Sequence, residues 1–237
     1  MTIYIKTMPR ERYRAGLIHS TNSYNYSKSA GIENLADRSL FNLLFDISRT
    51  TDTGFGLLVA FAINAYHQRL SRQVLDAIAE GSPVDLLHNE SAGAQASGRM
   101  VEAERLRAVL NVALRADLSA PTHTIACRFW EHLYETVRAE EFPDKPKRLK
   151  SFFVFKDEET AAWYRNTHNQ GELVCKVELT QRRVAFEADM TILDDIDETK
   201  NYAEALPEIR RYWRQEMNEA PRIEVLIQGQ VKLLGTL

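Results

Sequence analysis

Residues 151–165 read Ser-Phe-Phe-Val-Phe-Lys-Asp-Glu-Glu-Thr-Ala-Ala-Trp-Tyr-Arg, and this stretch decides the fold. Its first five residues form a compact apolar run, which predicts a strand over 151–155. Residues 158–165 then read as a helix. A strand that passes directly into a helix indicates a region where both kinds of element mix.

The chain beyond this stretch contains further strands. Between Leu173 and Leu179 apolar and polar side chains alternate, which is typical of a half-buried strand, and 184–186 could be another. Residues 202–213 carry apolar side chains at helical spacing. Two strands, 223–227 and 231–234, then flank Gly229, which predicts a bend or a bulge at the glycine.

The chain ahead of the stretch is mostly helical. It begins with a short strand, Ile3–Thr7, followed by a loop at 19–34. A helical pattern covers 36–80, with a break near residues 49–54 and a second helix that continues toward Ile78. The Ala, Ser and Gly of 89–98 look flexible, and two more helices are expected over 103–113 and 125–140.

Together these patterns predict an α+β fold. We expect the first strand to join the later strands in one split sheet, with the helical block, 36–118, as a large insertion after that strand. The block carries helical stripes and no cluster of reactive residues, so the chemistry is expected outside it.

Composition narrows the functional classes. The 237 residues carry a formal net charge of −3, which argues against a general nucleic-acid-coating surface but leaves room for a local basic patch. Two cysteines, Cys127 and Cys175, suggest neither a disulfide framework nor a zinc site, so a reducing cytoplasm is expected. The longest apolar stretch, 54–65, is too short to span a bilayer, and no membrane partner is expected.

A resemblance adds to these patterns. The motifs E-x-V-R and F-P-x-x-P-x-R precede the strand at 151, a Tyr-Trp pair stands at 212–213, and 223–231 reads Ile-Glu-Val-Leu-Ile-Gln-Gly-Gln-Val. In order and spacing this resembles a family of uncharacterised bacterial proteins, over roughly residues 130–235. That family is in turn similar, more distantly, to the ADP-ribosyltransferase fold, which transfers ADP-ribose from NAD.

The resemblance implies a fold, a cofactor and a set of site residues. It implies one ADP-ribosyltransferase-like domain, 1–237, whose split antiparallel sheet builds an NAD cleft from 130–237 together with 1–20. Glu224 corresponds to the catalytic glutamate. The residues implied to bind NAD are Tyr4, Thr7, Arg148, Ser151, Phe153 and Tyr164. The first strand departs from the family pattern, because Ile5 stands where a histidine is expected.

These residue types suit that chemistry, and each has a simpler alternative. A fixed carboxylate such as Glu224 would stabilise the cationic ribose formed when NAD is cleaved, whereas an exposed edge-strand glutamate would do nothing. Glutamine is nearly isosteric with glutamate, so Glu224→Gln is expected to keep the fold. Phe153 and Tyr164 would stack on nicotinamide or simply pack in the core.

The charged stretches carry similar alternatives. Arg148, in a basic run over 145–150, would grip the pyrophosphate, or it would belong to a solvated basic turn. The acidic run 194–198 is read as a solvated loop in preference to a magnesium site, and no metal is expected.

Two functions follow as expectations. The first is an ADP-ribosyltransferase that uses NAD as a substrate and modifies a protein or nucleic-acid acceptor, in the setting of a bacterial toxin, effector or phage-conflict enzyme. The second is a non-catalytic binding or partner-recognition module derived from the same fold, which Ile5 favours.

Overall fold

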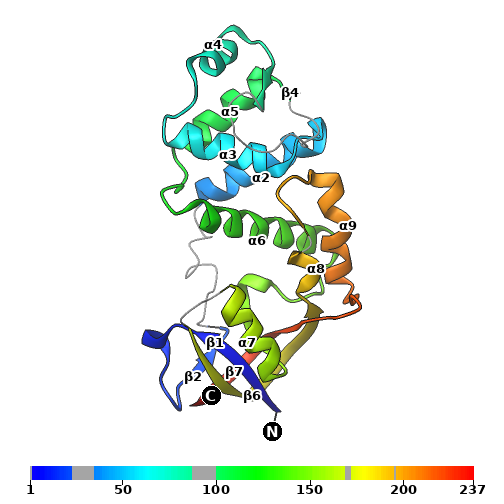
Figure 1. Cartoon of the computed structure of the whole chain (residues 1–237). Coiled ribbons are helices and arrows are strands. Elements are labelled where there is room, and N and C mark those ends of the chain that lie inside the picture. Colours follow the sequence, from blue (N-terminus) through cyan, green and yellow to red (C-terminus); the bar gives the residue numbers. More distant parts are fainter. Residues whose placement is uncertain (1, 23–34, 87–99, 169–171, 195) are drawn as a thin grey trace. The chain divides into compact units, whose positions relative to one another are not determined.

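The computed structural model describes residues 2–22, 35–86, 100–168, 172–194 and 196–237. The chain divides into two compact units (Figure 1). The strand unit comprises Met1–Ser29, Val137–Asp194 and Arg210–Leu237, and the helical unit comprises Ala30–Thr136 and Asp195–Ile209. The predicted α+β class is confirmed, and the main sheet is antiparallel.

The sheet of the strand unit closes on itself. Its strands are β1 (Thr2–Met8), β2 (Ile18–Ser20), β5 (Phe152–Phe155), β6 (Leu173–Asp189) and β7 (Ile223–Thr236). Their order is β2-β7-β5-β1-β6, and β6 also pairs with β7. Four strands therefore form a ring, β7-β5-β1-β6, and β2 pairs with residues 230–232 of β7, beyond the part of β7 that pairs with β5. The weakest link is between β1 and β5, where one register pair, Ile5 with Phe155, joins the strands.

The two longest strands are continuous where the sequence suggested pairs of short ones. Residues 184–186 belong to β6, and 223–227 and 231–234 are the two halves of β7. The bend predicted at Gly229 is present: its φ is 143°, and a Cβ at this position would lie 1.9 Å from the carbonyl oxygen of Gln181. The β6–β7 register also shifts beside it, between Arg182 and Val184. Glycine thus lets both strands turn together without ending.

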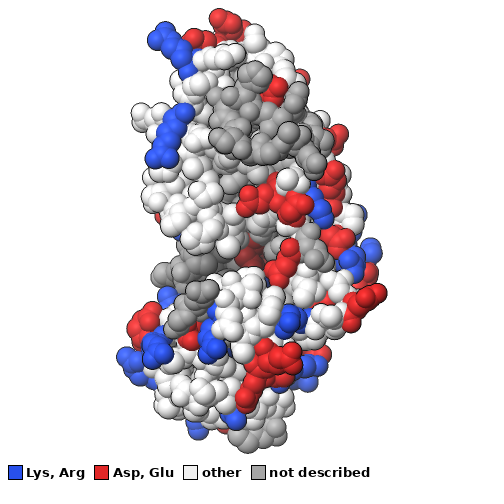
Figure 2. Space-filling view, in the orientation of Figure 1, with Lys and Arg blue, Asp and Glu red and all other residues white. Residues whose placement is uncertain are grey.

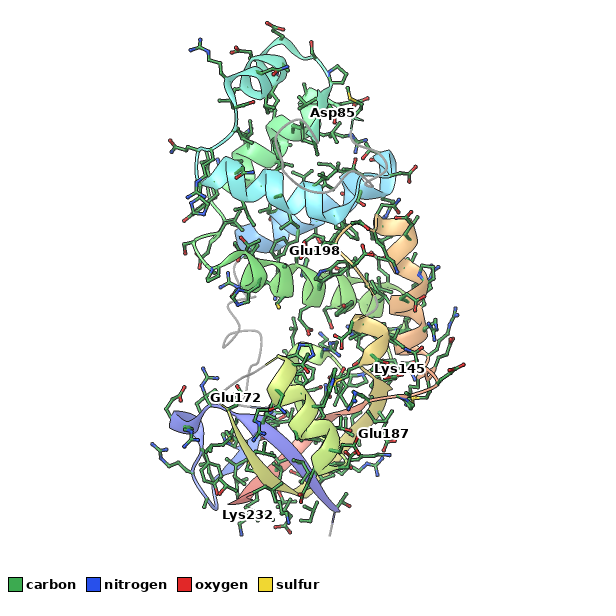
Figure 3. The ribbon with its side chains drawn as sticks, in the orientation of Figure 1. Asp85, Lys145, Glu172, Glu187, Glu198 and Lys232 are labelled. Atoms are coloured by element: carbon green, nitrogen blue, oxygen red, sulfur yellow. The ribbon has the colours of Figure 1, made fainter. Side chains whose placement is uncertain are left out.

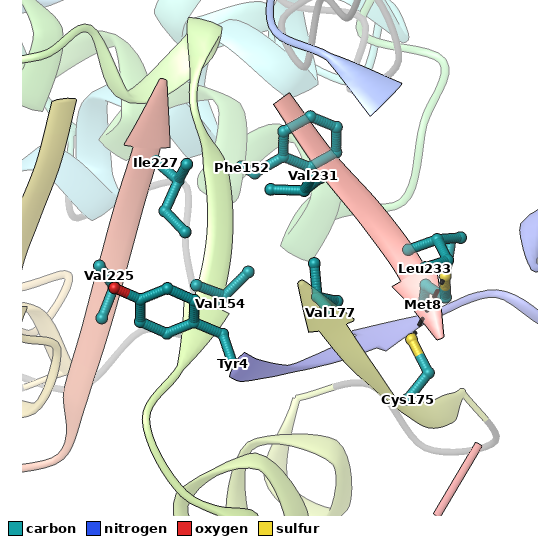
Figure 4. Close-up of a cluster of buried hydrophobic side chains, with 10 residues drawn as sticks. All are labelled: Tyr4, Met8, Phe152, Val154, Cys175, Val177, Val225, Ile227, Val231 and Leu233. Atoms are coloured by element: carbon teal, nitrogen blue, oxygen red, sulfur yellow. Dashed lines mark hydrogen bonds between the residues drawn. The ribbon is translucent and has the colours of Figure 1, made fainter. Parts of the chain in front are cut away.

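Apolar side chains fill the inside of the ring (Figure 4). Because side chains alternate between the two faces of a strand, every second residue of each strand points inward. The cluster consists of Tyr4, Met8, Phe152, Val154, Cys175, Val177, Val225, Ile227, Val231 and Leu233. These residues hold together strands that are far apart in the sequence.

A helix covers the other face of these strands. Helix α7 (Glu158–Thr167) begins at Asp157, whose carboxylate accepts a hydrogen bond from the backbone N–H of Thr160 at 2.7 Å. The helix packs on a second cluster, formed by Ile5, Phe155, Ala161, Val174 and Met190, with Trp163 and Tyr164 partly buried against it. We call this side of the strands the helix-covered face. The short elements of the strand unit are η1 (Arg10–Arg12), η3 (Arg148–Lys150) and α8 (Thr191–Asp194).

The helical unit has an aromatic core. Its elements are α2 (Leu35–Thr51), α3 (Phe55–Tyr66), α4 (Arg72–Glu80), β3 (Val84–Asp85), β4 (Met100–Val101) and α5 (Ala103–Ala113). Helices α6 (Thr122–Glu141) and α9 (Tyr202–Trp213) lie mostly in this unit, and their last residues belong to the strand unit. The rings of Phe45, Phe55 and Phe129 meet with centroids 5.0–6.1 Å apart.

Three local expectations need correction or fall outside the structure. The helix expected to run from 57 to 78 is two helices, because Gln68 has a positive φ of 56° and Ser71 caps a new start. Residues 18–20 form β2, although the composition of 19–34 predicts a loop there. Residues 23–34 of that loop and the flexible-looking 89–98 lie outside the described residues.

Candidate functional site

Glu224 lies in a row of residues that crosses three strands. It is paired in register with Phe155 on β5, and Phe155 is paired with Ile5 on β1. Residues directly opposite each other in a sheet share a face, so all three are on the helix-covered face. At about 4.8 Å between strands, Ile5 and Glu224 are roughly 10 Å apart. Ile5 and Glu224 thus face the same side of the sheet.

Glu224 belongs to a buried network of three polar side chains. Arg148 Nη1 donates to Glu224 Oε1 at 2.5 Å, and the side chains of this ion pair are each 6% exposed. The hydroxyl of Tyr212 donates to the same oxygen at 2.6 Å and also accepts a hydrogen bond from Arg148 Nη1. The alternatives of a solvent-facing edge glutamate and of a solvated turn for Arg148 are therefore wrong, because both charges are buried and paired.

The two oxygens of this carboxylate differ. Both hydrogen bonds of Glu224 to described side chains end on Oε1. Glu224 Oε2 accepts no hydrogen bond from a described residue. It is also not one of the described polar atoms that are fully buried without a hydrogen bond. The network therefore fixes the carboxylate through one oxygen and leaves the other for a further donor.

An aromatic ring flanks the network. The guanidinium of Arg148 lies over the ring of Phe153, 4.9 Å from the centroid, and 5.1 Å from that of Tyr212. Such contacts add cation–π attraction to the ion pair. Phe153 is thus in contact with the charged group, as well as with the sheet.

Other predicted residues lie around this group without joining it. Tyr164, on α7, packs its ring against Phe155 at 5.1 Å. Ser151 is fully buried and donates to the carbonyl oxygen of Lys147 at 2.8 Å. Thr7 is buried on β1, two residues from Ile5 and therefore on the same face. Tyr4 differs, because its side chain lies inside the ring, in the apolar cluster of Figure 4.

Sequence reasoning gave no role to Tyr212 or Lys6. The Tyr-Trp pair was visible as a motif, but nothing local indicated that its hydroxyl meets Glu224. Lys6 Nζ donates to the carbonyl oxygen of Phe153 at 2.9 Å and so bridges β1 and β5 beyond their single register pair. Burial lowers the pKa of Lys6, while the nearby Cys175 and Glu172 act in the opposite direction.

In the acidic run near residue 194, Asp197 forms hydrogen bonds with a residue close to it in the chain. Asp197 accepts hydrogen bonds from the backbone N–H and the hydroxyl of Thr199, and these bonds lower the pKa of Asp197. Across the described ranges, no three His, Cys, Asp or Glu side chains are grouped as a metal site would require. Within the same ranges, no helix combines the length and the apolar character needed to cross a membrane.

The fold and the site define an α+β protein with a buried Arg–Tyr–Glu network beside a helix-covered sheet face. A family model described as "Protein of unknown function (DUF2441)" matches residues 64–237. The chain belongs to this family, since the match covers well over half of it. No curated protein matches the chain.

Proposed function

We propose that the strand unit is an ADP-ribosyltransferase that uses NAD as its substrate and modifies a macromolecular acceptor. The observation that carries the proposal is the Glu224 carboxylate, held through Oε1 by Arg148 and Tyr212 with Oε2 left for a ligand. The shared face of Glu224 and Ile5 supports it further, because the family resemblance expects its two sheet motifs on one side.

The chemistry assigns one task to the carboxylate. In the transfer, the bond between ribose C1 and nicotinamide breaks, and nicotinamide leaves with the electron pair. The acceptor nucleophile then bonds to C1 and loses its proton. Between these events the ribose carries positive charge, which a preorganised carboxylate stabilises. Glu224 Oε2 would accept a hydrogen bond from a ribose hydroxyl, and Tyr164 or Phe153 would contact the nicotinamide ring.

The experiment is incubation of the protein with labelled NAD in the presence of cell lysate. Nicotinamide release and label transfer are read separately. Glu224→Gln is expected to reduce turnover by about 10²–10³-fold per folded molecule, with the larger effect in kcat. Wild-type turnover in this variant, or an absence of both NAD binding at millimolar concentration and turnover in the folded wild type, would overturn the proposal.

A second candidate has an observation of its own. Arg148 neutralises Glu224 at 2.5 Å, and Ile5 stands in place of a histidine. Both features suit a non-catalytic module that keeps the fold for binding. This candidate predicts that NAD or another ligand binds without release of nicotinamide, so calorimetry beside the turnover assay separates the two.

A further inference from the structure

The two units carry opposite charge. Within its sequence bounds the strand unit has 20 Lys and Arg against 15 Asp and Glu, and the helical unit has 10 against 18. The formal charges are therefore +5 and −8, which together give the −3 of the whole chain. A near-neutral total thus conceals a basic unit, and a basic unit attracts polyanions.

Six basic side chains of the strand unit surround β2. Arg10, Arg12 and Arg14 are exposed in the segment before this strand. That segment is fixed to β7, because Gly16 N–H donates to the carbonyl oxygen of Leu233 at 2.8 Å and the hydroxyl of Tyr13 donates to that of Leu234. The three arginines are therefore presented on a fixed segment.

The other three lie on β7, which pairs with β2, and on β6, which pairs with β7. Lys232 of β7, labelled in Figure 3, is directly opposite Ile18, the first residue of β2. Past the other end of β2, Arg183 donates to the Asn22 side chain at 2.6 Å, and Arg182 is paired with Gly229. We call the six residues the β2 basic edge: Arg10, Arg12, Arg14, Arg182, Arg183 and Lys232.

Within the described residues, the hydrogen bonds of these side chains go to uncharged groups: Arg14 donates to backbone carbonyl oxygens and Arg183 to Asn22. None of the six forms an ion pair with a described carboxylate, although the same unit pairs Arg210 with Glu141 at 2.7 Å. Two acids are close in the chain or the sheet: Glu11, within η1, and Glu178, opposite Lys232. Figure 2 shows basic side chains over the end of the strand unit where β1 and β2 lie in Figure 1.

We propose that the β2 basic edge binds single-stranded nucleic acid through its phosphates. From residue 16 to residue 21 an extended chain spans roughly 17 Å, long enough for several successive phosphates. Arginine supplies five of the six groups, and its planar fork matches a phosphate. Between the two basic ends, Ile18 is 56% exposed and shares the sheet face of Lys232, so an unstacked base would cover it. The proposal stands independently of the NAD chemistry.

The test is fluorescence anisotropy with labelled 20-nucleotide uridine and thymidine oligomers between 50 and 200 mM salt. Six phosphate contacts predict a slope of log K against log salt of about −4. The variant Arg10→Gln/Arg12→Gln/Arg14→Gln should bind at least about tenfold more weakly at 50 mM salt and lower the slope by about 2. A matched control, Arg69→Gln/Arg72→Gln/Arg115→Gln, removes the same charge from exposed positions of the helical unit and should change binding less than twofold.

Three outcomes would overturn the proposal. The first is an absence of binding to either oligomer at 50 mM salt by the folded wild type. The second is an equal loss in the control variant, which would indicate a general charge effect. The third is binding to vesicles with 30% phosphatidylserine but to neither oligomer, which would identify a lipid surface instead. Circular dichroism of each variant verifies that it is folded.

Discussion

The buried network makes Glu224→Gln a test of stability as well as of chemistry. Near-isosteric packing alone suggested that this variant keeps its fold, but the structure changes that expectation. The substitution leaves the guanidinium of Arg148, which is 6% exposed, without the negative charge 2.5 Å away. Breaking a buried pair by removing one partner costs about 3–5 kcal/mol. For a chain of this length that corresponds to a fall in Tm of roughly 6–20 °C.

The double variant Arg148→Met/Glu224→Gln measures the coupling. Removing both charges relieves the unpaired guanidinium, so the double variant should be more stable than Glu224→Gln by about 2 kcal/mol or more. Urea unfolding followed by circular dichroism and tryptophan fluorescence gives these values, and the buried Trp213, beside Tyr212, reports on the strand unit. Glu187→Gln is the control, because its pair with Lys156 is 41–47% exposed and should contribute less than about 1 kcal/mol.

A Glu224→Gln protein within about 1 kcal/mol of the wild type would refute this reasoning. It would mean that the ion pair does not hold the two charges in a desolvated site. The same unfolding measurement also sets the conditions of the turnover assay, because activity must be compared at a temperature and urea concentration where the variant is folded.

Further predictions concern single positions. Gly229→Ala should destabilise the strand unit by about 3 kcal/mol or more in urea unfolding, because of its φ of 143° and the 1.9 Å approach to Gln181, whereas Gly235→Ala, with open space, should be near neutral. Asp189→Asn should cost about 2–3 kcal/mol in the same assay, since its Oδ2 accepts the N–H of Asn218 at 2.9 Å and an amide in its place leaves two donors facing each other. Burial lowers the pKa of His132 from 6.5 to about 4, so folding favours the neutral ring and stability falls as pH drops from 6.5 toward 4, by at most about 3 kcal/mol. His132→Phe should reduce the dependence of Tm on pH over that range, and substitution of the exposed His123 by glutamine should not. An unchanged slope of Tm against pH in His132→Phe would show that other groups cause the effect.

The sequence predicted the elements better than their connections. Alternation at 173–179 and the apolar run at 151–155 identified strands, because successive side chains of a strand point to opposite faces and this shows in the local sequence. The local sequence does not show which strands pair with each other, so the ring and the continuity of β6 and β7 could not be anticipated. Gly229 was identified as a bend because a glycine between two apolar runs weakens a straight strand and is typical of a bulge or a sharp turn of the backbone.

The candidate site was predictable only residue by residue. The resemblance selected Glu224 and Arg148, and the structure brings them together, but their direct contact required two segments 76 residues apart to meet. Tyr4 was selected with them, yet it points into the ring interior, since residues 4 and 5 of one strand face opposite ways. The basic surface was not visible in the net charge of the chain, because that charge is the sum of a basic strand unit and an acidic helical unit.

The closure of the sheet has a consequence for how the protein is made. β1 ends at Met8, whereas β7, which completes the ring, begins only at Ile223. At typical synthesis rates of about 5–20 residues per second, β1 waits roughly 10–40 s for that partner. During this interval its apolar side chains and open hydrogen-bonding edge are available to other nascent chains. The strand unit is therefore expected to form only after β7 has emerged, and its yield should depend on chaperones far more than that of the helical unit.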